Sequence, residues 1–185
     1  MKPILLMALV LFCTSAVSQN KENTPAPVLP MSKETGLIAW EGVTDITGTT
    51  KDELYNRAIA WAQKYYKNPN DVLREKDPAA GKIVIKARFK IYNPADKKGL
   101  TTDAGDVMYT LTLQFKDGKY KYELTKFTWM QASAFPCERW NDTSSPSYKK
   151  EYPHYLTQLD AKATEILLAL KKVMTASGEG KKDDW

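Results

Sequence analysis

The sequence has very few of the side chains that most often carry out chemistry. It contains two cysteines and one histidine, His154, in 185 residues. Cys13 lies in an N-terminal apolar run, which leaves Cys137 alone in the rest of the chain. A single cysteine cannot form an intramolecular disulfide, and one histidine without a cysteine cluster does not make a zinc site. These shortages exclude a disulfide-stapled fold, and we predict no cofactor and no metal site.

Long hydrophobic runs and tracts of one charge are also missing. The apolar stretch from Ile4 to Phe12 is too short to cross a bilayer as a helix, which needs about 20 apolar residues. The formal net charge of +5 is spread along the chain. That distribution favours solubility and does not form a basic tract for nucleic acid. We therefore predict no transmembrane segment and no nucleic-acid partner.

Residues 1–18 are typical of a signal peptide. A positive residue precedes the apolar run, and Ala16 and Ser18 are small residues at the positions that a signal peptidase reads. We predict cleavage between Ser18 and Gln19, and hence an exported protein that is periplasmic or extracellular. Lipid anchoring at Cys13 is the alternative, but a phenylalanine stands where that signal has a small residue.

The rest of the chain predicts one domain between two polar ends. Residues 19–35 are polar and contain prolines, which is typical of a flexible leader. Residues 178–185 mix both charges and indicate a frayed tail. Residues 36–177 then form a single domain with a loop insertion at about 131–152, where no periodicity is sustained.

Two helices are indicated by apolar residues three or four positions apart. Thr50 and Glu53 form a capping box before the first stripe, and Pro153 is a favoured first-turn residue before the second. The first stripe is Leu54, Ala58, Trp61 and Tyr65, and the second is Leu156, Leu159, Ala163, Ile166, Leu170 and Val173. Each helix is expected to bury one face.

Strands are indicated by alternation of apolar and polar residues. Leu37–Trp40, closed by Gly42, predicts a first strand, and residues 82–90 predict a half-buried second one. Asp117-Gly118 is a preferred two-residue hairpin turn, which places Lys116 opposite Lys119. The buried pairs are then Phe115 with Tyr120, Leu113 with Tyr122 and Leu111 with Leu124. The order β-α-β-β-β-α predicts an α+β fold, an antiparallel sheet with two helices on one face.

Several stretches resemble a family of exported bacterial domains of unknown function. They are Lys51-Asp52-Glu53-Leu54-Tyr55-Asn56-Arg57-Ala58 ahead of Trp61, Gly81-Lys82-Ile83-Val84 with Lys86-Ala87, and the run from Phe115 to Glu123. The resemblance covers roughly residues 38–127. It implies a fold like that of the TATA-binding protein (TBP-like), a curved antiparallel sheet backed by two helices. It brings no catalytic residues, and the fold name implies no DNA binding, because function resides in sites.

Three groups of polar residues are candidates for chemistry, and none has a specific motif. Cys137 with His154 is the one conceivable nucleophilic pair. Three aspartates, Asp96, Asp103 and Asp106, could line a Ca²⁺ loop but lack its glycine-punctuated spacing. A basic stripe could hold phosphates, although a solvated sheet face explains it better. The stripe consists of Lys82, Lys86, Arg88 and Lys90 with Lys121.

The candidate ligand-binding residues lie in or beside the long loop: Trp140, Arg139, Tyr148 and Tyr152. Aromatic rings next to an arginine can stack on a sugar or anchor a protein partner. The interpretation that we favour is that these rings pack as a satellite core, because aromatic side chains most often simply pack. Whether Trp140 is exposed or packed discriminates the two. The curved sheet face could equally be the working surface, and the sequence does not indicate the oligomeric state.

We predict a non-enzymatic binding module at the bacterial cell envelope, with a protein, peptide or glycan ligand and no catalytic residues. The alternative is a hydrolytic enzyme that uses polar residues of the 131–155 segment. An enzyme requires convergent polar groups in a cleft, whereas a binding module requires an exposed aromatic patch.

Overall fold

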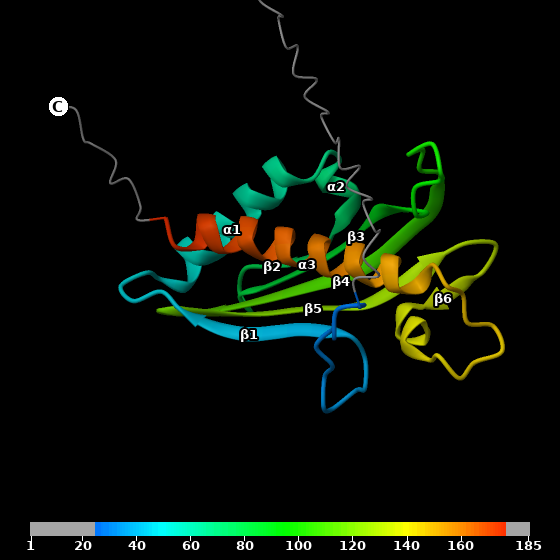
Figure 1. The fold of residues 1–185 in the computed structure, drawn as a ribbon. Coiled ribbons are helices and arrows are strands. Elements are labelled where there is room, and N and C mark those ends of the chain that lie inside the picture. Colours follow the sequence, from blue (N-terminus) through cyan, green and yellow to red (C-terminus); the bar gives the residue numbers. More distant parts are fainter. Residues whose placement is uncertain (1–24, 177–185) are drawn as a thin grey trace, which may run out of the picture.

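A six-stranded sheet with two long helices on one face makes up the computed structural model, which describes residues 25–176 (Figure 1). The elements are β1 (Ala39–Asp45), α1 (Lys51–Tyr65), α2 (Pro69–Val72), β2 (Leu73–Asp77), β3 (Lys82–Tyr92), β4 (Asp103–Lys116), β5 (Lys119–Met130), β6 (Ala134–Pro136), the 3₁₀ helix η1 (Cys137–Asn141) and α3 (Tyr152–Met174). The predicted α+β class with two helices on one face of an antiparallel sheet is confirmed.

The strands run in the order β1-β5-β4-β3-β2, and β6 pairs with the far end of β5. All pairings are antiparallel. The hairpin register predicted from Asp117-Gly118 is confirmed, with Lys116 opposite Lys119 and Phe115 opposite Tyr120. β2 and β6 were not predicted from the sequence, because five and three residues give too short a pattern to show a period.

The helices begin where their capping signals lie. The hydroxyl of Thr50 accepts the N–H of Glu53 at 3.2 Å, as the capping box predicts. In α3, Pro153 stands in the first turn, where its missing N–H costs no helical hydrogen bond. Both helices lay their apolar stripes on the same face of the sheet, and this holds them side by side (Figure 1).

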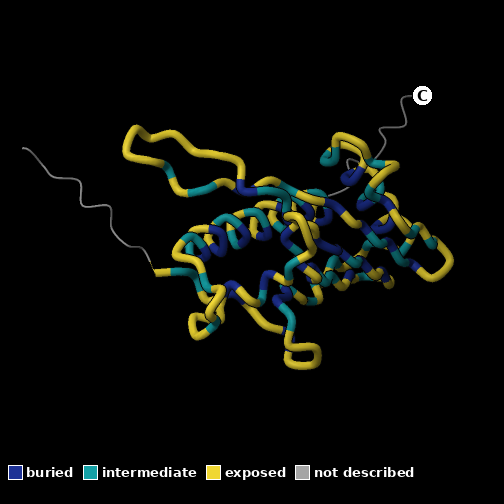
Figure 2. The backbone as a smooth tube through the Cα atoms, turned by 90° about the vertical axis from the view of Figure 1, so that its right-hand side faces the viewer, coloured by how far each residue is buried: buried dark blue, intermediate teal, exposed yellow. Residues whose placement is uncertain are grey.

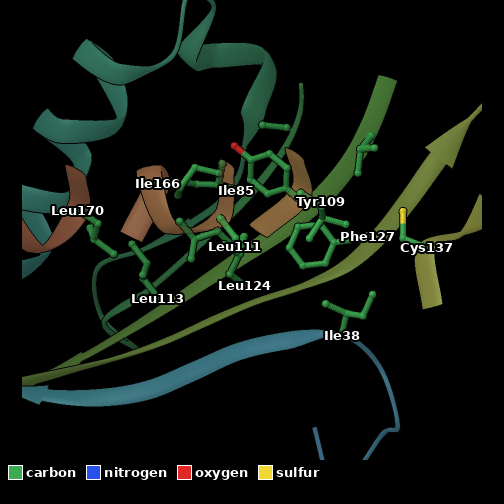
Figure 3. Packing of buried hydrophobic residues seen from close by; sticks show 14 of the residues in the cluster. Ile38, Ile85, Tyr109, Leu111, Leu113, Leu124, Phe127, Cys137, Ile166 and Leu170 are labelled. Atoms are coloured by element: carbon green, nitrogen blue, oxygen red, sulfur yellow. The ribbon is translucent and has the colours of Figure 1, made fainter. Parts of the chain in front are cut away.

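The core lies between the helices and the sheet. Figure 2 shows the buried positions inside the molecule and the exposed ones in the loops and hairpin tips. Figure 3 shows Leu111 and Leu124 on adjacent strands beneath Ile166 and Leu170 of α3. All four side chains are at most 1% exposed, so the hydrophobic effect acts mainly through this layer.

A bulge in β5 changes which residues face the core. Thr110 pairs with Thr125 but Met108 pairs with Thr128, so β5 holds one extra residue there. Lys126 adopts a φ of +58° at this point. The inward positions of β5 therefore change from even numbers, such as Leu124, to odd numbers. This change directs Phe127 and Trp129 into the core.

The predicted leader at 19–35 is wrong over its last part. Leu29 is 5% exposed and Ser32 is 7% exposed. The chain folds back here, because Met31 forms a bridge with Ile38 and Ala39 donates its N–H to the carbonyl of Pro30. The prolines are compatible with this edge position, where their missing N–H groups are not needed. The earlier part of the leader, the signal segment and the residues from 177 onward lie outside the described residues.

Two further boundaries differ from the sequence prediction. The first strand runs past Gly42 to Asp45, because it stays paired with β5 up to Lys119. Gly42 leaves room for the ring of Tyr122, since an added Cβ would lie 2.8 Å from Tyr122 Oη. The predicted loop at 131–152 contains β6 and η1. Its aromatic side chains are drawn into the core, which fixes the backbone around them.

Candidate functional site

The predicted aromatic site is divided between core and surface. Trp140 is fully buried and Tyr152 is 2% exposed, whereas Arg139 is exposed and Tyr148 is half-buried. Burial of Trp140 and Tyr152 agrees with the interpretation that these rings pack as a satellite core, and it leaves no exposed aromatic patch formed by these two side chains. A role of Arg139 and Tyr148 in ligand binding stays a prediction.

Trp140 is held by three rings from two elements. Its centroid lies 5.7 Å from that of Trp129 on β5, and 6.0 and 5.5 Å from those of Tyr152 and Tyr155 on α3. Arg139, its neighbour, instead places its guanidinium carbon 5.4 Å from the Phe135 ring centre at the surface. The cluster joins η1 to the sheet and α3, so its role is to fix this end of the fold.

The nucleophilic pair of the enzyme alternative does not form. Cys137 is fully buried beside the core (Figure 3), and burial raises the pKa of its thiol. His154 is exposed on α3 and contacts the ring of Tyr155. No hydrogen bond joins Cys137 and His154 in the part of the chain that the structure describes. A neutral, inaccessible thiol does not fit a nucleophile, which requires thiolate.

The three aspartates of the predicted Ca²⁺ alternative do not converge. Asp103 and Asp106 both face Lys90 on the sheet surface. Their neighbour Asp96 accepts the N–H groups of Lys98 and Leu100 within its own loop. Across residues 25–176 no three histidine, cysteine or carboxylate side chains are grouped as metal ligands. The Ca²⁺ alternative is therefore not supported by the geometry.

The basic stripe lies on the sheet face away from the helices, where most of its charges are paired. Lys82 contacts Glu75 at 3.1 Å, Arg88 contacts Asp106 at 3.5 Å, and Lys90 contacts Asp103 at 2.5 Å. This hydrogen bond from Lys90 is the main reason why the pKa of Asp103 is lowered. The stripe is thus a solvated sheet face with ion pairs, which is the explanation that the sequence favours over a phosphate site.

A partly buried tyrosine pair lies where the end of α1 meets the sheet. The hydroxyls of Tyr66 and Tyr109 lie 3.1 Å apart, and burial raises the pKa of Tyr109 to about 12. Next to them, Tyr65 donates to Glu165 of α3 at 2.8 Å. These phenols stay protonated at neutral pH and join α1 to the sheet and to α3. Tyr66 lines a surface pocket together with Asp71, Arg74 and Arg88, but Tyr109 does not line it.

A mainly apolar groove lies at the surface between the C-terminal half of α3 and β1, and Figure 1 shows α3 in the layer that covers the strands. We call it the α3–β1 groove. Its volume is about 220 Å³, and it is lined by Trp40, Thr44, Tyr120, Tyr122, Thr164, Leu167, Leu168, Leu170 and Lys171. Leu168 is 62% exposed on its wall, and Trp40 and Tyr122 are half-buried. Unlike the rings around Trp140, these side chains are accessible to a ligand.

The groove exists because α3 does not cover the whole sheet. The alternation of β1 directs Trp40 and Thr44 to the helix face, beside Tyr122 of β5. Because α3 does not extend over Trp40, Thr44 and Tyr122, one side of each of these side chains stays open to solvent. Sequence reasoning missed the site. The signal that could have found it is Leu168, an apolar residue that stands off the buried stripe of α3 between Ile166 and Leu170.

A groove of this size fits side chains of a partner better than a small molecule. Ligand pockets for small molecules measure about 300–1,000 Å³ and are largely enclosed. The α3–β1 groove is smaller and open along β1. Within the described residues no helix is long and apolar enough to cross a bilayer.

Comparisons with known proteins agree on the fold. Residues 40–129 match the family described as a domain of unknown function (DUF4468) with TBP-like fold. A crystal structure of a TBP-like protein from Parabacteroides distasonis ATCC 8503 is similar, with a TM-score of 0.63 and 15% identity, over 80% of this chain and 97% of that one. A DUF4468 family protein from Bacteroides ovatus ATCC 8483 gives a TM-score of 0.64 and 16% identity, over 80% and 91%.

At these identities the two bacterial structures establish the fold alone, and the comparison with curated proteins found no significant match. The family resemblance and the TBP-like fold predicted from the sequence are confirmed. Residues 40–129 thus match the DUF4468 family model, and the fold of the chain is TBP-like.

Proposed function

We propose that the protein is an exported, non-enzymatic binding module of the bacterial cell envelope, and that it binds a segment of peptide or protein in the α3–β1 groove. The observation that carries this proposal is an accessible, mainly apolar groove with Leu168 and Trp40 on its walls. Burying such exposed apolar area is the main favourable contribution in most protein association.

The enzyme alternative has weaker support. Its thiol is buried and neutral, and the lining of the groove holds no carboxylate, histidine or cysteine. A glycan ligand would need several convergent polar groups to bind its hydroxyls, and the groove offers mainly apolar walls. We therefore favour a peptide over a sugar.

Replacement of Leu168 by glutamate should weaken ligand binding without unfolding the protein. Peptides are selected from a random phage library on the mature chain, and their dissociation constants are measured by isothermal titration calorimetry. We expect at least about tenfold weaker binding, since removing one leucine contact costs about 1.5 kcal/mol or more and the new carboxylate must be desolvated.

The matched control is Leu100→Glu, because Leu100 is 64% exposed and lies in the β3–β4 loop. It should bind the selected peptides as the parent does. Equal binding by the Leu168→Glu variant would place the site elsewhere. Selection of no peptide, with oligosaccharides raising the melting temperature of the parent only, would replace the peptide by a glycan.

Export can be tested by cell fractionation and mass spectrometry after expression in the organism of origin or in a bacterial host. The prediction is that expression of the full chain yields a periplasmic or secreted form whose mass corresponds to a chain starting at Gln19. Full-length protein found only in the cytoplasmic fraction would contradict it. A form that carries lipid at Cys13 would support the lipoprotein alternative.

A further inference from the structure

β1 is an edge strand beside the α3–β1 groove, and its outer edge is open. β1 stands at the end of the strand order, and no other strand pairs with its outer edge within residues 25–176. The N-terminal segment occupies only the beginning of this edge, where Ala39 donates its N–H to Pro30. From Glu41 to Asp45 the edge is exposed, and Val43 is 61% exposed.

Hydrogen bonds on both sides show which backbone groups point outward. Ile46 donates its N–H to the carbonyl of Gly118, toward β5, whereas Ala39 donates away from β5. Even-numbered residues of β1 therefore bond to β5, because the direction alternates along an antiparallel strand. It follows that Glu41, Val43 and Asp45 direct their N–H and C=O groups to the open edge.

The two faces of this edge differ in chemistry. Trp40 and Thr44 face the groove under α3. Glu41, Val43 and Asp45 face the opposite side of the sheet, and neither carboxylate of this group forms an ion pair with a described residue. A strand added here would place alternate side chains in the groove and the others opposite two carboxylates.

We infer that the ligand of the α3–β1 groove is an extended peptide that adds to β1 as a further antiparallel strand, with apolar residues in the groove and basic residues opposite Glu41 and Asp45. The inference rests on the proposed function and specifies how the ligand binds. Strand addition supplies affinity through main-chain hydrogen bonds, and alternate side chains supply specificity.

A second copy of the chain is a poorer occupant. Two β1 edges paired antiparallel about Val43 would place Glu41 of one copy opposite Asp45 of the other. Like charges directly opposite each other in a sheet are destabilising. The same carboxylates favour a partner with lysine or arginine at these positions, so charge selects a basic peptide over self-association.

The probe is the peptide Lys-Leu-Thr-Leu-Lys with blocked ends. Paired antiparallel with its threonine opposite Val43, it places both lysines opposite Glu41 and Asp45 and both leucines toward the groove. We expect it to bind the mature chain in a fluorescence-polarisation titration, and to bind better than Glu-Leu-Thr-Leu-Glu. The double variant Glu41→Lys with Asp45→Lys should reverse this preference.

Two measurements test strand addition itself. Val43→Pro removes an outward N–H at an edge position that tolerates proline, and should weaken binding at least about tenfold, whereas Val43→Ala keeps the N–H and should bind as the parent does. In the peptide, N-methylation of the threonine should abolish binding, and N-methylation of a leucine, whose N–H points away from β1, should not. The N-methylated peptides give an answer even where the proline variant does not fold.

The outcomes separate this inference from the proposed function. Binding that is lost with Leu168→Glu but unaffected by Val43→Pro and by N-methylation would overturn strand addition and keep the groove as the site. The inference would be overturned if Leu168→Glu, Val43→Pro and N-methylation of the peptide all left the dissociation constant unchanged. It would also be overturned if the probe did not bind at millimolar concentration. Equal dissociation constants for Lys-Leu-Thr-Leu-Lys and Glu-Leu-Thr-Leu-Glu would overturn the inferred preference for a basic peptide.

Discussion

Replacement of Trp140 by alanine is expected to lower the free energy of unfolding by about 3–5 kcal/mol, the range for a buried aromatic side chain. Trp140 has no exposed surface and contacts three other rings, so the truncation leaves a large cavity between η1, β5 and α3. The measurement is urea denaturation followed by far-ultraviolet circular dichroism, which does not depend on tryptophan fluorescence.

Trp140→Phe separates the ring from its N–H group. Trp140 Nε1 is buried and has no hydrogen-bond partner among the described residues. Removal of an unpaired buried donor offsets part of the lost packing, so we expect a smaller loss of about 1–2 kcal/mol. Leu100→Ala, at an exposed loop position, is the control and should lie within about 0.5 kcal/mol of the parent. A Trp140→Ala variant as stable as this control would mean that η1 is not packed on the core in solution.

The same result would decide how binding data on Trp140 variants are interpreted. The sequence makes Trp140 a candidate ligand-binding residue, and on that interpretation loss of binding by Trp140→Ala would be taken as loss of a contact. The structure places this ring in the core. Loss of binding would instead report unfolding of the segment around η1, whereas Leu168 on the groove wall tests a contact directly.

The parts of the fold that the sequence predicts are those with local signals. The turn at Asp117-Gly118 sets the β4–β5 register through backbone geometry alone, and Thr50 sets the start of α1 through one hydrogen bond. Neither signal depends on the rest of the chain. The helical stripes are equally local, since a spacing of three or four residues defines a face without knowledge of its partner.

The parts that it does not predict depend on distant residues. The bulge at Lys126 changes the alternation of β5, so that Trp129 joins a core that Tyr152 and Trp140 approach from other elements. The periodicity of β5 alone gives no sign of this meeting. The same holds for the α3–β1 groove, which depends on how far α3 extends over β1.

Among glycine-to-alanine substitutions in the sheet, Gly105→Ala is expected to lower the free energy of unfolding most. Gly105 lies in β4 at a register shift opposite Ile91, with φ at +102°. This conformation is strained for any residue with a Cβ, by about 1–3 kcal/mol. The added Cβ would also lie 2.8 Å from the carbonyl oxygen of Met130, a backbone atom that cannot rotate away.

The neighbouring contacts enlarge this effect. The indole N–H of Trp129 and the amide of Gln131 both donate to the carbonyl of Ala104, at 2.7 and 2.8 Å, and both donor nitrogens lie within 3.2 Å of the new Cβ. Displacement of Trp129 would loosen the rings around Trp140. We therefore expect the free energy of unfolding, measured by urea denaturation, to fall by about 3 kcal/mol or more, which exceeds the cost of backbone strain alone.

Gly99→Ala separates the two causes of the Gly105 effect. Gly99 also has a positive φ, at +82°, but no atom lies within 4 Å of an added Cβ. Its cost is then backbone strain alone, about 1–2 kcal/mol. If Gly105→Ala and Gly99→Ala lower the stability equally, the crowding between β4 and β5 does not exist in solution. A larger loss for Gly105→Ala would show that close packing of β4 against Met130 and Trp129 of β5, and not backbone strain alone, requires a glycine at this position.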